Sequence, residues 1–358
     1  MHRAGFYSTN ELEMIKQFGG KVSKELKNKY KTSPNWDNGT FKNLVKTGTE
    51  ISIHNLPKLL YKQFFGKEGR TPENPIPIKK FDKEEFLKPD SEPKFIWFGH
   101  SVILLRLNAK TILIDPMLGD NASPIAPFKT KRFSENTLDL IDDFPEIDLL
   151  IMTHDHYDHL DLASIEKLQS KVGVYFVGLG VGRHLEAWGI DPNKITEFDW
   201  WDEQNFEDIK ITYTPTRHAS GRGINDQSQC LWGGWVFKTE KQNIYFSGDG
   251  GYGDHFKDIG KKLGPFDFGF IECGQYNENW HQIHMYPEES VQAAFDAGVK
   301  KALPIHWCGF ALAQHHWKDP IQRFYKESKA KNLEISTPNI GEIINYNSPT
   351  LPWWEAFK

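Results

Sequence analysis

Short apolar runs separated by turn residues recur from about residue 93 to the end of the chain. Their content of branched and aromatic residues is typical of strands, and the stretches between them have helical spacing. The expected strands are 95–98, 102–107, 111–115, 148–153, 174–177, 195–198, 209–214, 231–237, 243–247, 268–272 and 302–305. The expected helices are 162–169, 181–188, 254–262, 287–297 and 320–329. This alternation runs through two similar halves and predicts an α/β fold, with two sheets packed face to face and helices outside.

The first 90 residues lack this regularity. Breakers interrupt them at Gly19-Gly20, Ser33-Pro34 and in the Pro-rich stretch 71–77. We therefore expect an N-terminal extension over 1–90, packed on a main domain over 91–358. Within the extension, residues 56–70 mix apolar residues with lysines. We favour a strand or helix packed on the main domain with solvated lysines, and the alternative is an amphipathic element on a lipid surface.

Composition narrows the class of protein. Hydrophobic residues make up 39% and charged residues 25%, which excludes a disordered chain. No apolar run reaches the roughly 18 to 20 residues of a membrane span. The N-terminal residues lack the apolar region of a signal peptide, so a cytoplasmic or peripheral membrane location is favoured. The three cysteines are too few and too scattered to indicate a disulfide framework.

Charge is unevenly spread along the chain. Residues 1–90 hold 17 Lys and Arg against 11 Asp and Glu, whereas residues 91–358 hold 26 against 37. The acidic main domain repels phosphate backbones and argues against a nucleic-acid partner. The basic extension suits an anionic membrane surface.

The chemistry concentrates in residues 153–161, directly after an expected strand. His154, His156 and His159 alternate there with Asp155, Asp158 and Asp161. Such a cluster suits a core poorly, because buried polar groups need partners. Imidazole and carboxylate groups are good ligands for borderline divalent metals. The pattern H-x-H-x-D-H therefore predicts a metal site, with His154 and His156 on one ion and Asp158 and His159 on a second.

With this motif the chain resembles the metallo-β-lactamase superfamily. The resemblance implies a four-layer αβ/βα sandwich with a two-metal site at one end. We expect two zinc ions there, and other divalent ions are the alternative. Further ligands are expected after later strands, and His218, Asp249 and His306 stand in that order. Carried over position by position, His154, His156 and His218 would hold one zinc. Asp158, His159 and His306 would hold the other, and Asp249 would bridge them.

The likeness extends to one branch, the N-acyl-phosphatidylethanolamine phospholipase D family. It rests on residues 97–101, 114–116, 199–203, 231–233, 264–267, 284–289 and 305–307, and covers roughly residues 80–345. That family hydrolyses the distal phosphodiester of an N-acylated ethanolamine phospholipid at membrane surfaces. It releases an N-acylethanolamine and phosphatidic acid. The resemblance implies a phospholipid substrate and peripheral membrane association.

Two residues are expected to act in catalysis beyond holding metal. Asp158 would orient the attacking water, and His284 would protonate the leaving alkoxide, since the family places a histidine there. His100 is expected to support the metal loops rather than bind metal. A soluble zinc-dependent lactonase or small phosphodiesterase of the same fold is the alternative, followed by a metal-stabilised scaffold without activity. The acyl chain, the metal used in the cell and the oligomeric state stay open at this point.

Overall fold

The computed structural model describes residues 16–51, 54–66, 68–123 and 130–358. Most of the N-terminal stretch considered above as a signal peptide, residues 1–15, lies outside the described residues. So do residues 52–53 and 67 of the extension. Among the helices described, none has both the length and the apolar character that crossing a bilayer requires.

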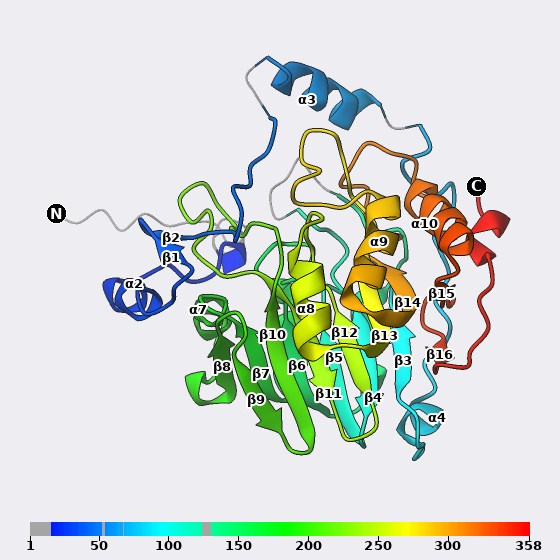
Figure 1. Cartoon of the computed structure of the whole chain (residues 1–358), viewed down its shortest axis with the longest axis horizontal. Coiled ribbons are helices and arrows are strands. Elements are labelled where there is room, and N and C mark those ends of the chain that lie inside the picture. The colour runs from blue at the N-terminus through cyan, green and yellow to red at the C-terminus, as the bar shows by residue number, and fades with distance from the viewer. Residues whose placement is uncertain (1–15, 52–53, 67, 124–129) are drawn as a thin grey trace.

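Two seven-stranded sheets form the centre of the fold (Figure 1). The first has the order β16-β3-β4-β5-β6-β7-β8 and the second the order β15-β14-β13-β12-β11-β10-β9. In each sheet three neighbouring pairs are antiparallel and three are parallel. The strands of the first sheet are β3 (Lys94–Trp97), β4 (Ile103–Leu107), β5 (Lys110–Ile114), β6 (Ile147–Met152), β7 (Val172–Gly178), β8 (Ile195–Phe198) and β16 (Ile343–Ile344). Those of the second are β9 (Glu203–Phe206), β10 (Ile209–Pro215), β11 (Gly233–Lys238), β12 (Asn243–Phe246), β13 (Phe266–Glu272), β14 (Val299–Ile305) and β15 (Glu334–Ile335).

Alternating side chains divide the core into layers. On β6, Leu149 and Ile151 join the cluster between the sheets, whereas Leu150 and Met152 join the cluster on the outer face. This period of two is what a strand buried on both faces requires. The helices that cover the first sheet are α5 (Leu140–Asp143), α6 (Leu162–Leu168) and α7 (Gly182–Ala187), and those that cover the second are α8 (His255–Leu263), α9 (Pro287–Ala297) and α10 (Asp319–Lys331). The four-layer αβ/βα sandwich is thus confirmed.

Three short strands of the two large sheets were not predicted. β9 has three exposed residues out of four, so it lacks the apolar run that marks the other strands. β15 and β16 have two residues each, and β16 pairs with β3 from the far end of the chain. Pairing over such a distance leaves no local signal in the sequence.

The N-terminal extension contains more regular structure than its breakers suggest. It holds α2 (Lys24–Tyr30), the hairpin β1–β2 (Trp36–Asp37 and Thr40–Phe41), α3 (Leu56–Phe65) and α4 (Lys83–Leu87). Tyr30 and Phe41 are fully buried, pack on one another and on Trp36, and connect to the large hydrophobic cluster of the sandwich. The boundary at residue 90 stays a prediction.

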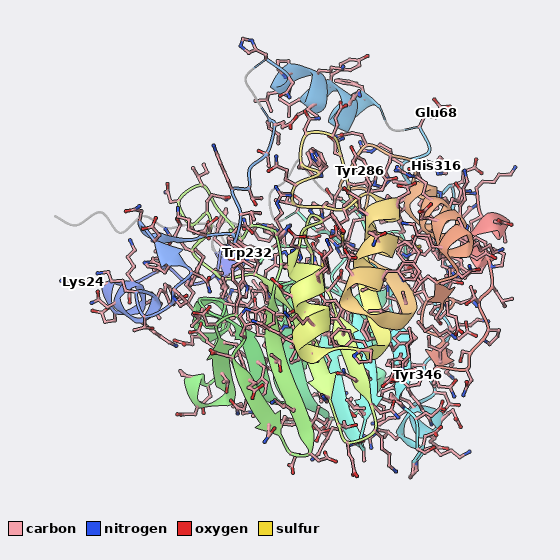
Figure 2. The ribbon with its side chains drawn as sticks, viewed as in Figure 1. Lys24, Glu68, Trp232, Tyr286, His316 and Tyr346 are labelled. Atoms are coloured by element: carbon pink, nitrogen blue, oxygen red, sulfur yellow. The ribbon has the colours of Figure 1, made fainter. Side chains whose placement is uncertain are left out.

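Helix α3 differs from the packing we favoured. It stands above the loops at one end of the sandwich, and its side chains project clear of the body (Figures 1 and 2). Leu60, Tyr61 and Phe65 are 47%, 66% and 72% exposed. The lysines are solvated as expected, but these apolar side chains are solvated too, so the preference for a helix packed on the main domain was wrong.

Candidate metal centre

The strand ends bring the predicted ligands together. In the first sheet β5 and β6 run parallel, and in the second β10 runs in the same direction as β12, β13 and β14. The carboxyl ends of strands that run in one direction meet at one edge of a sheet. The motif follows β6, and His218, Asp249 and His306 follow β10, β12 and β14. All seven predicted ligands lie at this end of the sandwich.

Three imidazoles converge on one point. The Nε2 atom of His154 lies 2.9 Å from Nδ1 of His156, and Nε2 of His218 lies 3.2 Å from the same atom. His218 donates its Nδ1 proton to the carbonyl oxygen of Ile283 at 2.9 Å, which fixes the tautomer that leaves Nε2 unprotonated. Burial is the main cause that lowers the pKa of all three imidazoles, so they are neutral. Hydrogen bonds among the three imidazoles cannot satisfy all three converging ring nitrogens. A single cation can bind all three.

A second group lies beside the first. One ligand atom each from Asp158, His159, His306 and His100 falls within 4.8 Å of the others. The Oδ2 atom of Asp249 is 2.9 Å from His159 Nε2, 3.2 Å from His306 Nε2 and 4.0 Å from His154 Nε2. Asp249 therefore contacts both groups, as the predicted bridging ligand would.

The unpaired atoms and charges fit divalent cations. Asp249 Oδ1 and His306 Nε2 are buried and have no hydrogen-bond partner among the described residues. The pKa of Asp158 and the pKa of Asp249 lie well below the usual range despite burial, because neighbouring histidines stabilise the carboxylates. Burial opposes protonation of His159, but the carboxylates of Asp249, Asp158 and Asp115 outweigh it and raise its pKa well above the usual range. The buried carboxylates thus hold a positive charge among them, and divalent cations would supply that charge instead.

A supporting layer holds the ligands in place. Asp115, just after β5, accepts hydrogen bonds from the backbone N–H and the hydroxyl of Thr153 at 2.8 and 2.7 Å, and its Oδ2 lies 2.7 Å from Nδ1 of His159. Such carboxylate–histidine pairs orient metal ligands. The sequence places Asp115 at the end of an expected strand, but it gives no sign that this carboxylate faces His159.

The backbone is strained at the same end. His100, Asp115 and His306 all have positive φ, at 53°, 44° and 65°. Residues other than glycine hold such angles only where the surrounding structure enforces them, and they cluster at functional sites. Hydrogen bonds from His100 N to Trp307 O and from His306 N to His100 O fix two of these residues at once.

His284 lies in the site with a partner that sequence reasoning missed. Its Nδ1 is 2.5 Å from Oε1 of Glu272, the last residue of β13. Burial raises the pKa of Glu272, but the adjacent protonated His284 favours its ionised form, so the two groups titrate as a pair. Burial also opposes protonation of His284, but the carboxylates of Glu272, Asp249 and Asp158 outweigh it, so the pKa of His284 is raised. The signal for Glu272 was a carboxylate at the end of the run 268–271, which has no polar side chain. Asp249 and His306 likewise stand after apolar runs.

The predicted support role of His100 has a geometric basis. His100 Nε2 lies 2.9 Å from Asp158 Oδ2, and the His100 side chain is fully buried. This contact orients the carboxylate, yet the same nitrogen belongs to the second ligand group. Its supporting role therefore stays a prediction.

A hollow of about 230 Å³ opens onto the cluster. Its walls combine His156, Asp158, His284 and other site residues with apolar Ile51, Trp280 and Leu312. Trp280 lies in the loop 275–280 that follows β13. The hollow thus joins the metal ligands to an apolar rim.

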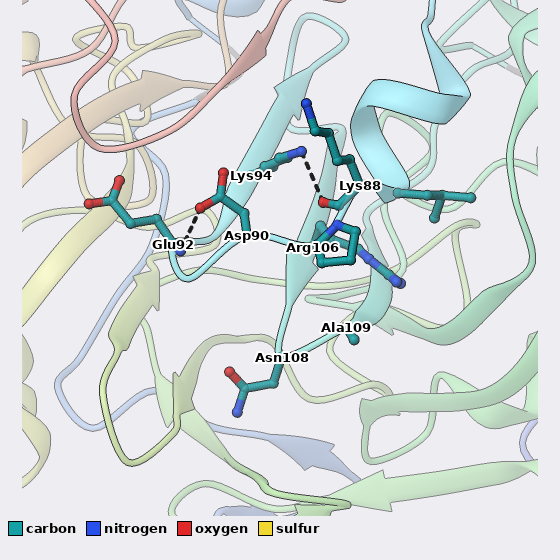
Figure 3. A pocket seen from close by; sticks show the side chains of 9 residues that line it. Lys88, Asp90, Glu92, Lys94, Arg106, Asn108 and Ala109 are labelled. Carbon is teal, nitrogen blue, oxygen red and sulfur yellow. Dashed lines mark hydrogen bonds between the residues drawn. The ribbon is translucent and has the colours of Figure 1, made fainter.

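A hollow at the opposite end of the sandwich has a different character (Figure 3). Its Lys94 ammonium donates to the carbonyl oxygen of Lys88 at 3.1 Å, and the backbone N–H of Glu92 donates to Asp90 at 3.1 Å. Arg106 and Asn108 are likewise paired, with Thr111 and Asp208. Because these polar groups already have partners, this hollow offers no comparable chemistry.

Similarity to known proteins agrees with this geometry. The family described as Beta-lactamase superfamily domain matches residues 110–307. An uncharacterized protein of Mycobacterium tuberculosis is 32% identical over 333 residues, covering 90% of this chain and 87% of that protein. The N-acyl-phosphatidylethanolamine-hydrolyzing phospholipase D 1 of Caenorhabditis elegans is 29% identical over 314 residues, covering 82% and 84%.

The fold has solved counterparts. Igni18, a metallo hydrolase of Ignicoccus hospitalis, superposes with a TM-score of 0.56 at 19% identity and covers 72% of this chain and all of that one. At this identity the likeness concerns the fold alone.

Proposed function

Because the chain belongs to the beta-lactamase superfamily and is a metal-dependent hydrolase, we propose that it is a dinuclear zinc phosphodiesterase. Its proposed substrate is N-acyl-phosphatidylethanolamine, which it would cleave to an N-acylethanolamine and phosphatidic acid. The similarity to the nematode phospholipase over most of both chains supports this substrate.

One observation carries the proposal: two neighbouring ligand groups share Asp249 beside a hollow with an apolar rim. His154, His156 and His218 would hold one ion, and Asp158, His159 and His306 the other. When bound, two divalent ions would activate water and offset the charge that makes a phosphodiester resist attack. The residues of the chain would then have two tasks: to hold the diester at the cluster and to transfer protons during its hydrolysis.

Asp158 and His284 have the placement for those tasks. Both line the hollow. The Asp158 carboxylate, held by His100, can accept a hydrogen bond from the attacking water and so orient it. The Nδ1 atom of His284 is occupied by Glu272, which leaves Nε2 as the atom that can deliver a proton to the leaving alkoxide. This relay matches general acid catalysis by a positioned imidazole.

Helix α3 supports a lipid substrate. At 100° per residue, Leu56, Leu60, Tyr61 and Phe65 spread over one half of the helix, and Lys58 and Lys62 lie beside them. Exposed apolar side chains flanked by lysines are typical of helices that lie on anionic membrane surfaces. We therefore propose that α3 rests on an anionic lipid surface and brings the hollow to its substrate.

The test is product analysis on vesicles. Zinc-loaded protein is incubated with N-acyl-phosphatidylethanolamine in phosphatidylglycerol vesicles, and products are followed by mass spectrometry. Asp158→Asn serves as the inactive variant. Asp142→Asn, which alters an exposed carboxylate paired with Lys167, serves as the matched control.

We expect N-acylethanolamine and phosphatidic acid from the wild type and from Asp142→Asn, and neither from Asp158→Asn. Absence of both products from a wild type that holds two zinc ions would contradict the substrate. Turnover of a soluble lactone or small phosphodiester in that case would establish the alternative of a soluble hydrolase.

A further inference from the structure

A residue of the N-terminal extension reaches the backbone of a predicted metal ligand. Asn43 follows the hairpin β1–β2 and lies 175 positions before His218 in the chain. Its Nδ2 donates to the carbonyl oxygen of His218 at 2.7 Å, and its Oδ1 accepts the N–H of His218 at 3.0 Å. One side-chain amide thus pairs with both backbone polar groups of this histidine, as a neighbouring strand would.

Asn43 is itself held on both sides. The indole N–H of Trp232 donates to Asn43 Oδ1 at 3.2 Å and to the carbonyl oxygen of Thr216 at 3.2 Å. Just before it, the N–H of Phe41 donates to the carbonyl oxygen of Ser228 at 2.7 Å. Phe41 also packs against Tyr30 and Trp36, with ring centroids 5.5 and 4.8 Å apart. The amide of Asn43 therefore extends from a small aromatic core that belongs to the extension.

The loop around His218 depends on such contacts. His218 follows β10 and precedes the stretch 219–232, which contains no strand. Neighbouring Arg217 donates to the hydroxyl of Thr47, a second tie to the extension, at 3.0 Å. The side chain of His218 is fixed by Ile283, but its backbone N–H and C=O both pair with Asn43.

We propose that Asn43 is a positioning residue for His218, so that the N-terminal extension completes the metal centre that the sandwich begins. The proposal rests on the two-metal centre proposed above. Loss of the amide would let the loop relax and move His218 Nε2 away from His154 and His156. Partners that orient metal ligands change metal affinity by about tenfold to a hundredfold when they are removed.

The experiment compares zinc retention in the full chain. Wild type, Asn43→Ala and Asn35→Ala are zinc-loaded and dialysed against graded chelator, and zinc per chain is measured by elemental analysis. Asn35 is the matched control because it is half-buried in the same extension, and its amide donates to Asp199, which is no proposed ligand, at 2.8 Å. Thermal unfolding of the metal-free proteins reports any general loss of stability.

We expect Asn43→Ala to release one of two zinc ions at a chelator concentration about tenfold to a hundredfold lower than wild type. Asn35→Ala should retain both ions as wild type does. Asn43→Asp keeps the size of the side chain but loses the donor to His218 O, so it should also release one ion early. It provides the readout if the alanine variant does not fold.

Equal retention by wild type and Asn43→Asp would overturn the proposal, and so would equally early release by Asn35→Ala. A wild type that binds no zinc would instead remove the metal centre on which the proposal rests. The two failures are therefore distinguishable.

Discussion

The ligand cluster and helix α3 lie at the same end of the molecule but are built in opposite ways. In the cluster the polar side chains are buried and held by one another, as His159 is by Asp115 and His284 by Glu272. On α3, Leu60, Tyr61 and Phe65 are exposed. If the proposed function is right, the cluster acts on any diester that reaches it, whereas α3 selects the surface from which that diester comes. Variants of the cluster should therefore lose activity on vesicle-bound and on water-soluble substrates. Variants of α3 should lose activity only on substrate held in vesicles.

Removal of the metals should have the largest effect on activity and should slow the hydrolysis of every substrate. Chelation should lower the hydrolysis of vesicle lipid and of a water-soluble phosphodiester by about a thousandfold or more, because the loss of several kcal/mol of charge stabilisation affects both reactions. Activity is measured before and after chelation, and again after zinc is restored. Activity on either substrate that survives complete metal removal would contradict this picture of the cluster.

Replacement of His284 by Asn should have the next largest effect, and the effect should depend on the leaving group. An alkyl phosphodiester needs a proton on its leaving oxygen, so its kcat should fall by about 10²- to 10⁴-fold. A nitrophenyl phosphodiester releases a stable anion and should be affected much less. Asn345→Ala, a change at a distant turn residue, is the control.

Equal losses on the two leaving groups would show that His284 does not act as a general acid. Glu272→Gln keeps an acceptor for His284 Nδ1 and removes the charge. Like His284→Asn, Glu272→Gln should lower kcat more for the alkyl diester than for the nitrophenyl diester, but by a smaller factor.

The double substitution Tyr61→Ser and Phe65→Ser should separate the two regions. Each aromatic side chain is worth about 1.5 to 3 kcal/mol when it leaves water, so vesicle binding and vesicle turnover should fall at least about tenfold. Turnover of the water-soluble diester should stay at the wild-type level. Vesicle binding is measured by co-sedimentation with phosphatidylglycerol vesicles. An unchanged vesicle affinity would exclude α3 as the docking element.

A buried histidine outside the cluster gives the smallest effect on activity. Burial lowers the pKa of His255 to about 4, so this side chain is neutral in the folded protein and charged below about pH 6.5 once unfolded. The stability that this shift contributes is complete above pH 6.5 and is lost as the pH falls towards 4.

The melting temperature of His255→Leu should therefore fall less than that of wild type as the pH is lowered from 6.5 to 4. Its activity and zinc content at pH 7 should equal those of wild type. Thermal unfolding across this pH range makes the comparison, and parallel curves for the two proteins would refute the buried neutral state of His255.

Sequence reasoning identified the proposed ligands more easily than the residues that support them. The motif after β6, and His218, Asp249 and His306 after later strands, were readable because apolar runs ended at polar residues. Asp115 and Asn43 were not, because each acts through a contact with a residue 44 or 175 positions away in the chain. Glu272 does end an apolar run, but the sequence gives no sign that it faces His284.

The exposure of α3 escaped prediction for a related reason. Its mixture of apolar residues and lysines fits a helix on a protein surface as well as one on a lipid surface. Only the position of the neighbouring elements decides whether Tyr61 and Phe65 meet protein or solvent.

The measurement that tests the central claim most directly is zinc content in wild type and Asp249→Ala. Asp249 Oδ2 contacts His159 and His306 of one group and approaches His154 of the other, so its loss should weaken both metal positions. The account predicts two zinc ions per wild-type chain and fewer in Asp249→Ala, as determined by elemental analysis after gel filtration. Two ions retained in the variant would contradict the bridge and the shared centre built on it.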